Sequence, residues 1–250
     1  MLGTQKKNLQ MKFTMFQYEL GPKKLSVTEM AFWGGLVFQL LLLLAPISAE
    51  KYLNIKTNGD SILFLYFIGL IPLVFSYIYQ YYEYENINTQ KRGHIEFDET
   101  GITLDYNLQI PYLSISHFRI DWERYYGQKI NKRPFGGPYP KYSLGVKNKL
   151  RFRSNDQEYE FHFKLEDETH LHQFQRFLLE LVTTDKLYHL PPKNQIGLIS
   201  DKFKHLSQFK YFVIKLIEEN RIDCTTGLLL HGYKTDKEAE LLRKKHCQGK

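Results

Sequence analysis

Two long apolar segments without a charged residue dominate the hydrophobic pattern of the chain. The first runs from Met30 to Ser48 over 19 residues, and the second from Ser61 to Tyr82 over 22 residues. Helices of these lengths extend roughly 28 and 33 Å, which matches a hydrocarbon core of about 30 Å. The pattern therefore predicts a transmembrane hairpin over 30–82. Gln39, an amide within the first segment, is expected to hydrogen-bond to the second helix.

Basic residues near the ends of these segments predict the orientation of the hairpin. The connecting loop, 49–60, carries Lys51 and Lys56. The outer flanks carry five basic residues within about 20 positions: Lys12, Lys23, Lys24, Lys91 and Arg92. Because cytoplasmic flanks carry the excess of Lys and Arg, both termini are expected in the cytoplasm. Three aromatic side chains are predicted at the membrane interface: Trp33, Tyr81 and Tyr82. The stretch 46–49 also fits a signal-peptide cleavage region, so removal of the first segment stays open.

From Gly93 onward the hydrophobic period changes to two, which predicts antiparallel strands. The predicted strands are 94–98, 102–107, 116–124, 143–154 and 158–164. Asp167 is then positioned to cap a helix. The apolar face of that helix consists of Leu171, Phe174, Phe177, Leu178 and Leu181. These elements predict an α+β fold, in which an antiparallel β-barrel or sandwich over 91–184 is capped by one helix.

The remaining segments flank this domain. Residues 1–29 read as a cytoplasmic tail, of which 11–20 is compatible with an edge strand. Residues 191–250 are predicted to form a small, mostly helical extension. Its first helix, 207–220, presents one apolar face: Phe209, Phe212, Val213, Leu216 and Ile217. The run 227–233 resembles a short strand, and Thr235 with Glu238 forms a capping box before the last helix.

Residues 30–184 resemble a known bacterial family. Two transmembrane helices precede FDETGI (97–102) and IPYLSI (110–115), and several strands and a helix follow. This arrangement is similar to the bacterial pleckstrin-homology-like domains of the YcxB type. The resemblance implies a pleckstrin-homology-like fold at a bacterial inner membrane. A long Pro/Gly loop and the C-terminal extension depart from the family pattern.

A segment rich in basic residues is the most distinctive chemical feature of the chain. The protein has a net charge of +7 and a sequence pI near 9.1. Residues 129–153 contain no Asp or Glu and eight basic residues: Lys129, Lys132, Arg133, Lys141, Lys147, Lys149, Arg151 and Arg153. The first six are our candidate binding residues for anionic lipid headgroups, with Phe135 and Tyr139 reaching the interface. A protein-binding loop and a merely solvated face remain alternatives for this segment.

Other chemistry is sparse. The two cysteines, Cys224 and Cys247, provide no disulfide framework, which fits a reducing compartment. No catalytic nucleophile with a base, phosphate-binding glycine loop or zinc-ligand spacing occurs. The turn 98–101 is acidic, which argues against a phosphoinositide pocket there. We therefore expect a non-enzymatic protein without cofactor, metal or nucleic acid partner.

The sequence favours a membrane-anchored binding protein. Its expected ligand at the cytoplasmic face is an anionic lipid surface or a protein partner. The alternative function is a membrane-resident adaptor or immunity-type protein that docks a partner through the 128–142 loop or the C-terminal extension. The oligomeric state stays open.

Overall fold

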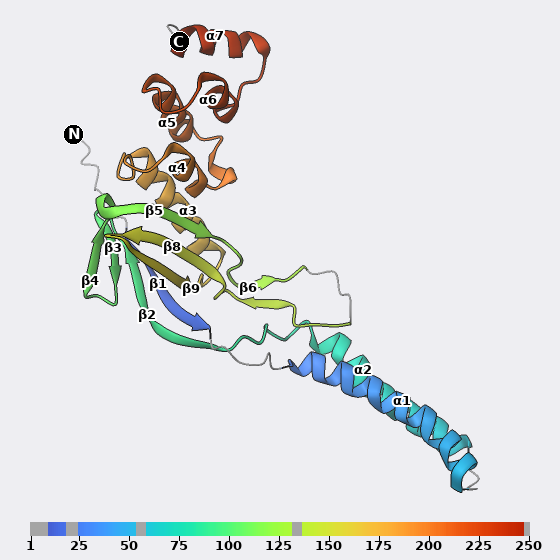
Figure 1. Ribbon diagram of the computed structural model, residues 1–250. Helices are drawn as coiled ribbons and strands as arrows, with labels where there is room; N and C mark the ends of the chain where they lie inside the picture. Colours follow the sequence, from blue (N-terminus) through green and yellow to red (C-terminus); the bar gives the residue numbers. More distant parts are fainter. Residues whose placement is uncertain (1–9, 19–24, 54–58, 132–136, 248–250) are drawn as a thin grey trace, which may run out of the picture. The chain divides into compact units, whose positions relative to one another are not determined.

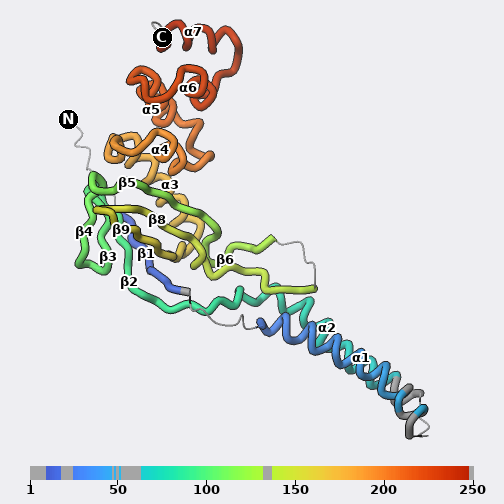
Figure 2. Tube along the Cα trace, viewed as in Figure 1, coloured from blue at the N-terminus to red at the C-terminus, as the bar shows by residue number. Residues whose placement is uncertain are grey.

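The chain forms two compact units. The computed structural model describes residues 10–18, 25–53, 59–131 and 137–247 (Figures 1 and 2). The first unit comprises Met1–Gln17, Lys91–Glu123 and Val146–Lys250, and the second comprises Tyr18–Gln90 and Arg124–Gly145. Both segments of the second unit are thus inserted between strands of the first.

A seven-stranded antiparallel sheet organises the first unit. Its strands are β1 (Met11–Tyr18), β2 (Thr89–Phe97), β3 (Gly101–Leu104), β4 (Leu108–Pro111), β5 (Ile115–Asp121), β8 (Asn148–Ser154) and β9 (Gln157–Phe163). Their order is β4-β3-β2-β1-β9-β8-β5. Strand β1 pairs with β9, with Met15 opposite Phe163. The prediction of an edge strand near residues 11–20 is therefore wrong, because β1 lies inside the sheet.

The expected α+β class is confirmed, but the sheet is not closed into a barrel. Strands β4 and β5 are consecutive in the chain, joined by a short 3-10 turn, η1 (Tyr112–Ser114), yet they form opposite edges of the sheet. Pro111 ends β4 without an N–H to donate to a partner strand. On β5, the carbonyl of Ile115 lies 2.7 Å from the Nε2 atom of His189. The two edges are not paired with each other.

Helix α3 (Glu168–Thr183) covers the apolar core of the sheet, as predicted. Asp167 caps it by accepting a hydrogen bond of 2.7 Å from the backbone N–H of His170. Phe174 is fully buried and its ring packs against those of Phe13, Phe97, Phe163 and Trp122. The apolar side chains of the strands and those of the helix thus pack together in one aromatic core.

The C-terminal extension is helical. Its elements are α4 (Pro192–Leu198), η2 (Asp201–Phe203), α5 (Ser207–Glu218), α6 (Cys224–His231) and α7 (Asp236–His246). The predicted apolar face of α5 is buried in full. Thr235 caps α7 as predicted, accepting from the Glu238 N–H at 3.2 Å, but the Glu238 carboxylate accepts from the Lys234 N–H at 2.8 Å and not from that of Thr235, as a capping box would require. The strand predicted over 227–233 is wrong, because Asp223 caps a helix there by accepting from the Thr226 N–H at 2.9 Å.

The two cysteines are also paired, contrary to the sequence-based expectation. A disulfide joins Cys224 and Cys247, whose Cα atoms lie 5.9 Å apart. Two isolated cysteines 23 positions apart give no sequence signal for this pairing. The helices α6 and α7 bring them together by turning back on each other.

The second unit combines two helices with a β-hairpin. Helix α1 spans Val27–Leu53 and α2 spans Gly59–Tyr79. Strands β6 (Tyr126–Lys129) and β7 (Tyr142–Leu144) form a separate antiparallel pair, with Lys129 opposite Tyr142. These two strands flank the predicted Pro/Gly loop, 133–142.

Candidate functional site

The helical hairpin of the second unit exposes an apolar surface. Within the described residues, one helical stretch, Val27–Pro46, is long and apolar enough to cross a membrane. Only 17% of its apolar window is buried, whereas the core helix of a soluble protein is mostly buried. Its length and composition fit a single span and a signal sequence alike. The apolar stretch of α2, Leu63–Tyr79, is shorter than that of α1. Helix length and hydropathy therefore support one of the two predicted spans.

The two helices pack closely through small residues and one amide. Gln39 donates a hydrogen bond of 2.9 Å from Nε2 to the carbonyl of Tyr66, which confirms the predicted interhelical bond. A Cβ atom on Gly69 would lie 2.7 Å from Gln39 Nε2, and one on Gly35 would lie 2.9 Å from Leu73 Cδ2. Glycine at both positions therefore allows the helices to approach.

One end of the hairpin is closed by a polar layer, which we call the collar and define as residues 25–29, 80–85, 126–130 and 137–144. Glu83 caps α1, accepting from the N–H groups of Val27 at 2.7 Å and Thr28 at 2.9 Å. Ser26 and Glu29 add a capping box: Ser26 Oγ accepts from the Glu29 N–H, and Glu29 Oε2 accepts from the Ser26 N–H. The first amides of α1 are thus satisfied by side chains at the end of an otherwise apolar helix.

Backbone hydrogen bonds attach β7 to the chain that follows α2. The Lys141 N–H donates to the Gln80 carbonyl at 3.0 Å, and the Glu85 N–H donates to the Tyr142 carbonyl at 2.8 Å. Glu85 Oε1 also accepts from Ser143 Oγ at 2.7 Å and from the Leu144 N–H at 3.1 Å. The β6–β7 pair is therefore attached to the segment that follows α2.

A glycine brings the connecting loop against α1. Gly137 adopts a φ of +103°, which residues other than glycine rarely adopt. A Cβ atom at this position would lie 2.3 Å from Phe32 Cε1. The loop and the first helix are consequently in direct contact at the collar.

Aromatic rings and one cation fill the outer part of the collar. The ammonium of Lys141 lies 4.0 Å from the ring centre of Tyr139 and 5.9 Å from that of Tyr81. Tyr84 stacks on Tyr126 with ring centres 4.9 Å apart. The side-chain hydrogen bond with Tyr126, together with burial, raises the pKa of the Tyr84 hydroxyl, which therefore stays neutral. Such clusters of Tyr and Lys are typical of a membrane–water interface.

The predicted interface aromatics lie on this unit. Trp33 is 48% exposed, and its ring meets that of Phe32 edge to face. Tyr81 and Tyr82 are 54% and 74% exposed. Tyr139 is half-buried and donates a hydrogen bond of 3.0 Å to the Ile130 carbonyl. Phe135 lies outside the described residues.

The structure divides the predicted basic segment between the two units. Lys129 is exposed at the end of β6, while Lys147 and Lys149 belong to the first unit. Lys149 pairs with Glu160 at 2.6 Å, and in the same sheet Arg151 pairs with Asp121. Lys132 and Arg133 lie outside the described residues. The six candidates are therefore not brought together on one unit.

Sequence reasoning missed Glu83 and Glu85, which hold the collar together. Both acids lie in the run YYEYE (81–85), directly after the second apolar segment. Charged residues at this position mark the end of that segment. The Ser26-x-x-Glu29 pattern before an apolar run is a recognisable capping-box signal that marks the start of α1. Together they indicate where the hairpin ends.

Comparison with known proteins adds no family assignment. The chain matches no protein-family model, no curated protein and no solved structure. Across the described ranges, no three His, Cys, Asp or Glu side chains gather to hold a metal ion. The function is therefore argued from the two units themselves.

Proposed function

We propose that α1 and α2 cross a bacterial inner membrane as a hairpin, with the collar at the cytoplasmic headgroup layer. The first unit is then a non-enzymatic binding domain on the cytoplasmic side, similar to the pleckstrin-homology-like domains of the YcxB type. The basic residues of the 129–142 segment bind anionic lipid headgroups. The observation that carries this proposal is the exposed apolar surface of the hairpin, bounded at one end by a capped, Tyr- and Lys-bearing collar.

The arrangement of polar groups supports insertion of both helices. Backbone amides cannot remain unpaired in hydrocarbon, and at this end of the hairpin the first amides of α1 are paired by Glu83 and Ser26. The one amide side chain midway along α1, Gln39, faces the partner helix. Helix α2 spans 21 residues, or about 31 Å, which is long enough for a bilayer core.

Charge supports an anionic lipid ligand. Residues 129–142 carry four basic residues and no acid: Lys129, Lys132, Arg133 and Lys141. The collar acids Glu83 and Glu85 are occupied by N–H and hydroxyl donors. Each basic group near an anionic surface contributes about 1 kcal/mol. The described part of the loop is packed on the hairpin, which favours a lipid ligand over a free docking loop.

Cysteine labelling tests the insertion and its orientation. In a chain with Cys224 and Cys247 replaced by Ser, single cysteines at Lys51 and Lys237 are treated with a membrane-impermeant maleimide on intact bacterial spheroplasts. We expect labelling at position 51 from outside, and labelling at 237 only after permeabilisation. Labelling of both positions from outside would contradict the hairpin, and loss of the N-terminal segment from the mature mass would show a cleaved signal sequence.

Lipid preference tests the ligand. The full chain is reconstituted with spin-labelled phosphatidylglycerol or phosphatidylcholine, and the motionally restricted lipid fraction is measured by electron spin resonance. We expect a preference for the anionic lipid that falls at least about fivefold when Lys129, Lys132, Arg133 and Lys141 become Glu. The matched control replaces four lysines of the C-terminal extension by Glu: Lys234, Lys237, Lys244 and Lys245. Equal effects of the two variants would refute headgroup binding by the basic residues of 129–142.

A further inference from the structure

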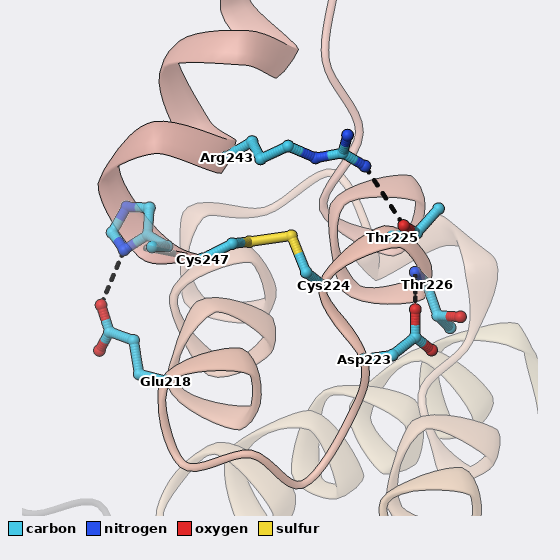
Figure 3. Close-up of a disulfide and its surroundings, with 8 residues drawn as sticks. Glu218, Asp223, Cys224, Thr225, Thr226, Arg243 and Cys247 are labelled. Atoms are coloured by element: carbon cyan, nitrogen blue, oxygen red, sulfur yellow. Dashed lines mark hydrogen bonds and ion pairs between the residues drawn. A yellow bond between two sulfur atoms is a disulfide. The ribbon is translucent and has the colours of Figure 1, made fainter. Parts of the chain in front are cut away.

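The last helix of the chain is held by a disulfide at its far end. Cys224 is the first residue of α6, Cys247 follows α7, and their bond closes a loop with a sequence separation of 23 (Figure 3). Both side chains are partly exposed, so small thiols in solvent can reach the bond. The disulfide is therefore both structural and accessible.

Helix α7 has few other attachments. None of its residues, Asp236 to His246, is buried, and Leu241 is 68% exposed. In contrast, α5 buries five large apolar side chains. A helix of 11 residues without a buried face is marginal by itself in water.

Two polar contacts supplement the disulfide. Arg243 Nη2 donates to Thr225 Oγ1 at 3.3 Å (Figure 3). His246 Nδ1 lies 2.7 Å from Glu218 Oε1. The Arg243 contact is exposed and contributes little to stability, whereas the His246 side chain is only 12% exposed beside Glu218 of α5. They orient α7 but do not replace a packed interface.

A groove separates α6 from α7. Its volume is about 310 Å³, and Leu228 and Leu229 of α6 line it opposite Ala239, Glu240 and Arg243 of α7. A closely packed interface has few voids of this size, and its side-chain contacts hold the two helices together. The groove shows that this interface is only partly filled.

We propose that Cys224–Cys247 is a reversible thiol–disulfide switch. The oxidised form holds α7 against α5 and α6, and the reduced form releases it. A low-molecular-weight thiolate attacks one sulfur of the bond, forms a mixed disulfide with that cysteine and displaces the other as a thiolate. A second thiol then releases the small-molecule disulfide, so that two electrons reduce the protein bond to two thiols. The reverse exchange with the small-molecule disulfide restores the bond.

Hydrogen exchange on the full chain in detergent micelles tests this switch. The protein is equilibrated with reduced or oxidised glutathione, and amide exchange is followed by mass spectrometry on peptides from α5 and α7. We expect reduction to accelerate exchange in α7 by at least roughly tenfold while α5 stays protected. Returning the sample to oxidised glutathione should restore the protection.

Two variants make the test specific. Cys247→Ser should show the rapid exchange of the reduced protein under both conditions. Thr225→Ala removes only the hydroxyl that Arg243 contacts, and it should keep the redox dependence. Equal protection of α7 in the oxidised and reduced chain would overturn the proposal. Persistence of the disulfide in excess reduced glutathione, or its failure to form in oxidised glutathione, would also overturn it.

Discussion

At the scale of single residues, Glu83 links the start of α1 to the chain that follows α2. Its two carboxylate oxygens accept from the N–H groups of Val27 and Thr28. A carboxylate at a helix N-terminus satisfies orphan donors and interacts favourably with the helix dipole. We expect Glu83→Ala to destabilise the hairpin by about 1–2 kcal/mol, measured by thermal unfolding in micelles with circular dichroism. Glu99→Ala, in the turn between β2 and β3 of the other unit, is the control, and an equal effect of the two changes would exclude the capping role.

His170 makes the stability of the first unit depend on pH. Its imidazole stacks on Phe13 with ring centres 4.7 Å apart. Burial lowers the pKa of His170, although the carboxylates of Glu166 and Asp167 act in the opposite direction. The unfolded chain therefore binds a proton at a higher pH than the folded chain does, so acidification through the ordinary pKa near 6.5 favours unfolding.

The expected result is a falling urea midpoint between about pH 7.5 and 5.5. The folded-state pKa of His162 is also lowered, mainly by burial, so it adds to the slope. His170→Phe keeps an aromatic ring on Phe13 and should reduce the dependence on pH. Gln173→Ala, at an exposed position of the same helix that does not titrate, is the control and should leave the dependence unchanged. A slope unaltered by His170→Phe would contradict this assignment.

At the scale of elements, β1 is a strand of the core although it precedes the hairpin. Phe13 is 2% exposed and packs against the rings of Phe97, Phe163 and Phe174. Replacement of a buried Phe by Ala costs about 3–5 kcal/mol. We expect Phe13→Ala to lower the unfolding free energy of the first unit by this amount in urea titrations. Gln17→Ala, on an exposed position of the same strand, should change it by less than about 0.5 kcal/mol; a similar small effect of Phe13→Ala would mean that β1 is not part of the stable sheet.

The elements that the sequence predicted are those with a strong local signal. The alternation of apolar and polar residues around Phe118 predicted β5, and the apolar helical face that ends at Leu181 predicted α3. Both signals arise because an element that buries one face repeats its apolar residues at its own structural period. Asp167 and Thr235 marked helix starts through capping. The run 227–233 failed because three consecutive leucines have no period, and Asp223 decided in favour of a helix.

Other features depend on contacts between distant positions. The place of β1 in the sheet follows from pairing Met15 with Phe163, almost 150 positions away in the sequence. The collar likewise needs Glu83 to meet Val27. The basic segment looked continuous at 129–153, yet its strands pair its charges with acids such as Glu160 on neighbouring strands. Local patterns carry no information on such pairings.

At the scale of the whole molecule, the two units have different stabilising forces. The first unit buries an aromatic core between its sheet and α3, and water drives that burial. The second exposes most of the apolar side chains along α1 and α2, so its stability depends on the lipid or detergent around it. Urea weakens the hydrophobic effect in water but has little access to hydrocarbon. The two units should therefore unfold separately.

The two tryptophans allow this to be measured, because each unit contains one. Trp33 lies on α1, and Trp122 packs against Phe163 and Phe174. In micelles, a Trp33→Phe chain reports the first unit through Trp122, and a Trp122→Phe chain reports the second through Trp33. We expect the Trp122 emission to show a cooperative urea transition while the Trp33 emission stays nearly constant over the same range. Adding Phe13→Ala should shift only the Trp122 transition. A common midpoint for both reporters, moving together with Phe13→Ala, would show that the units unfold as one body.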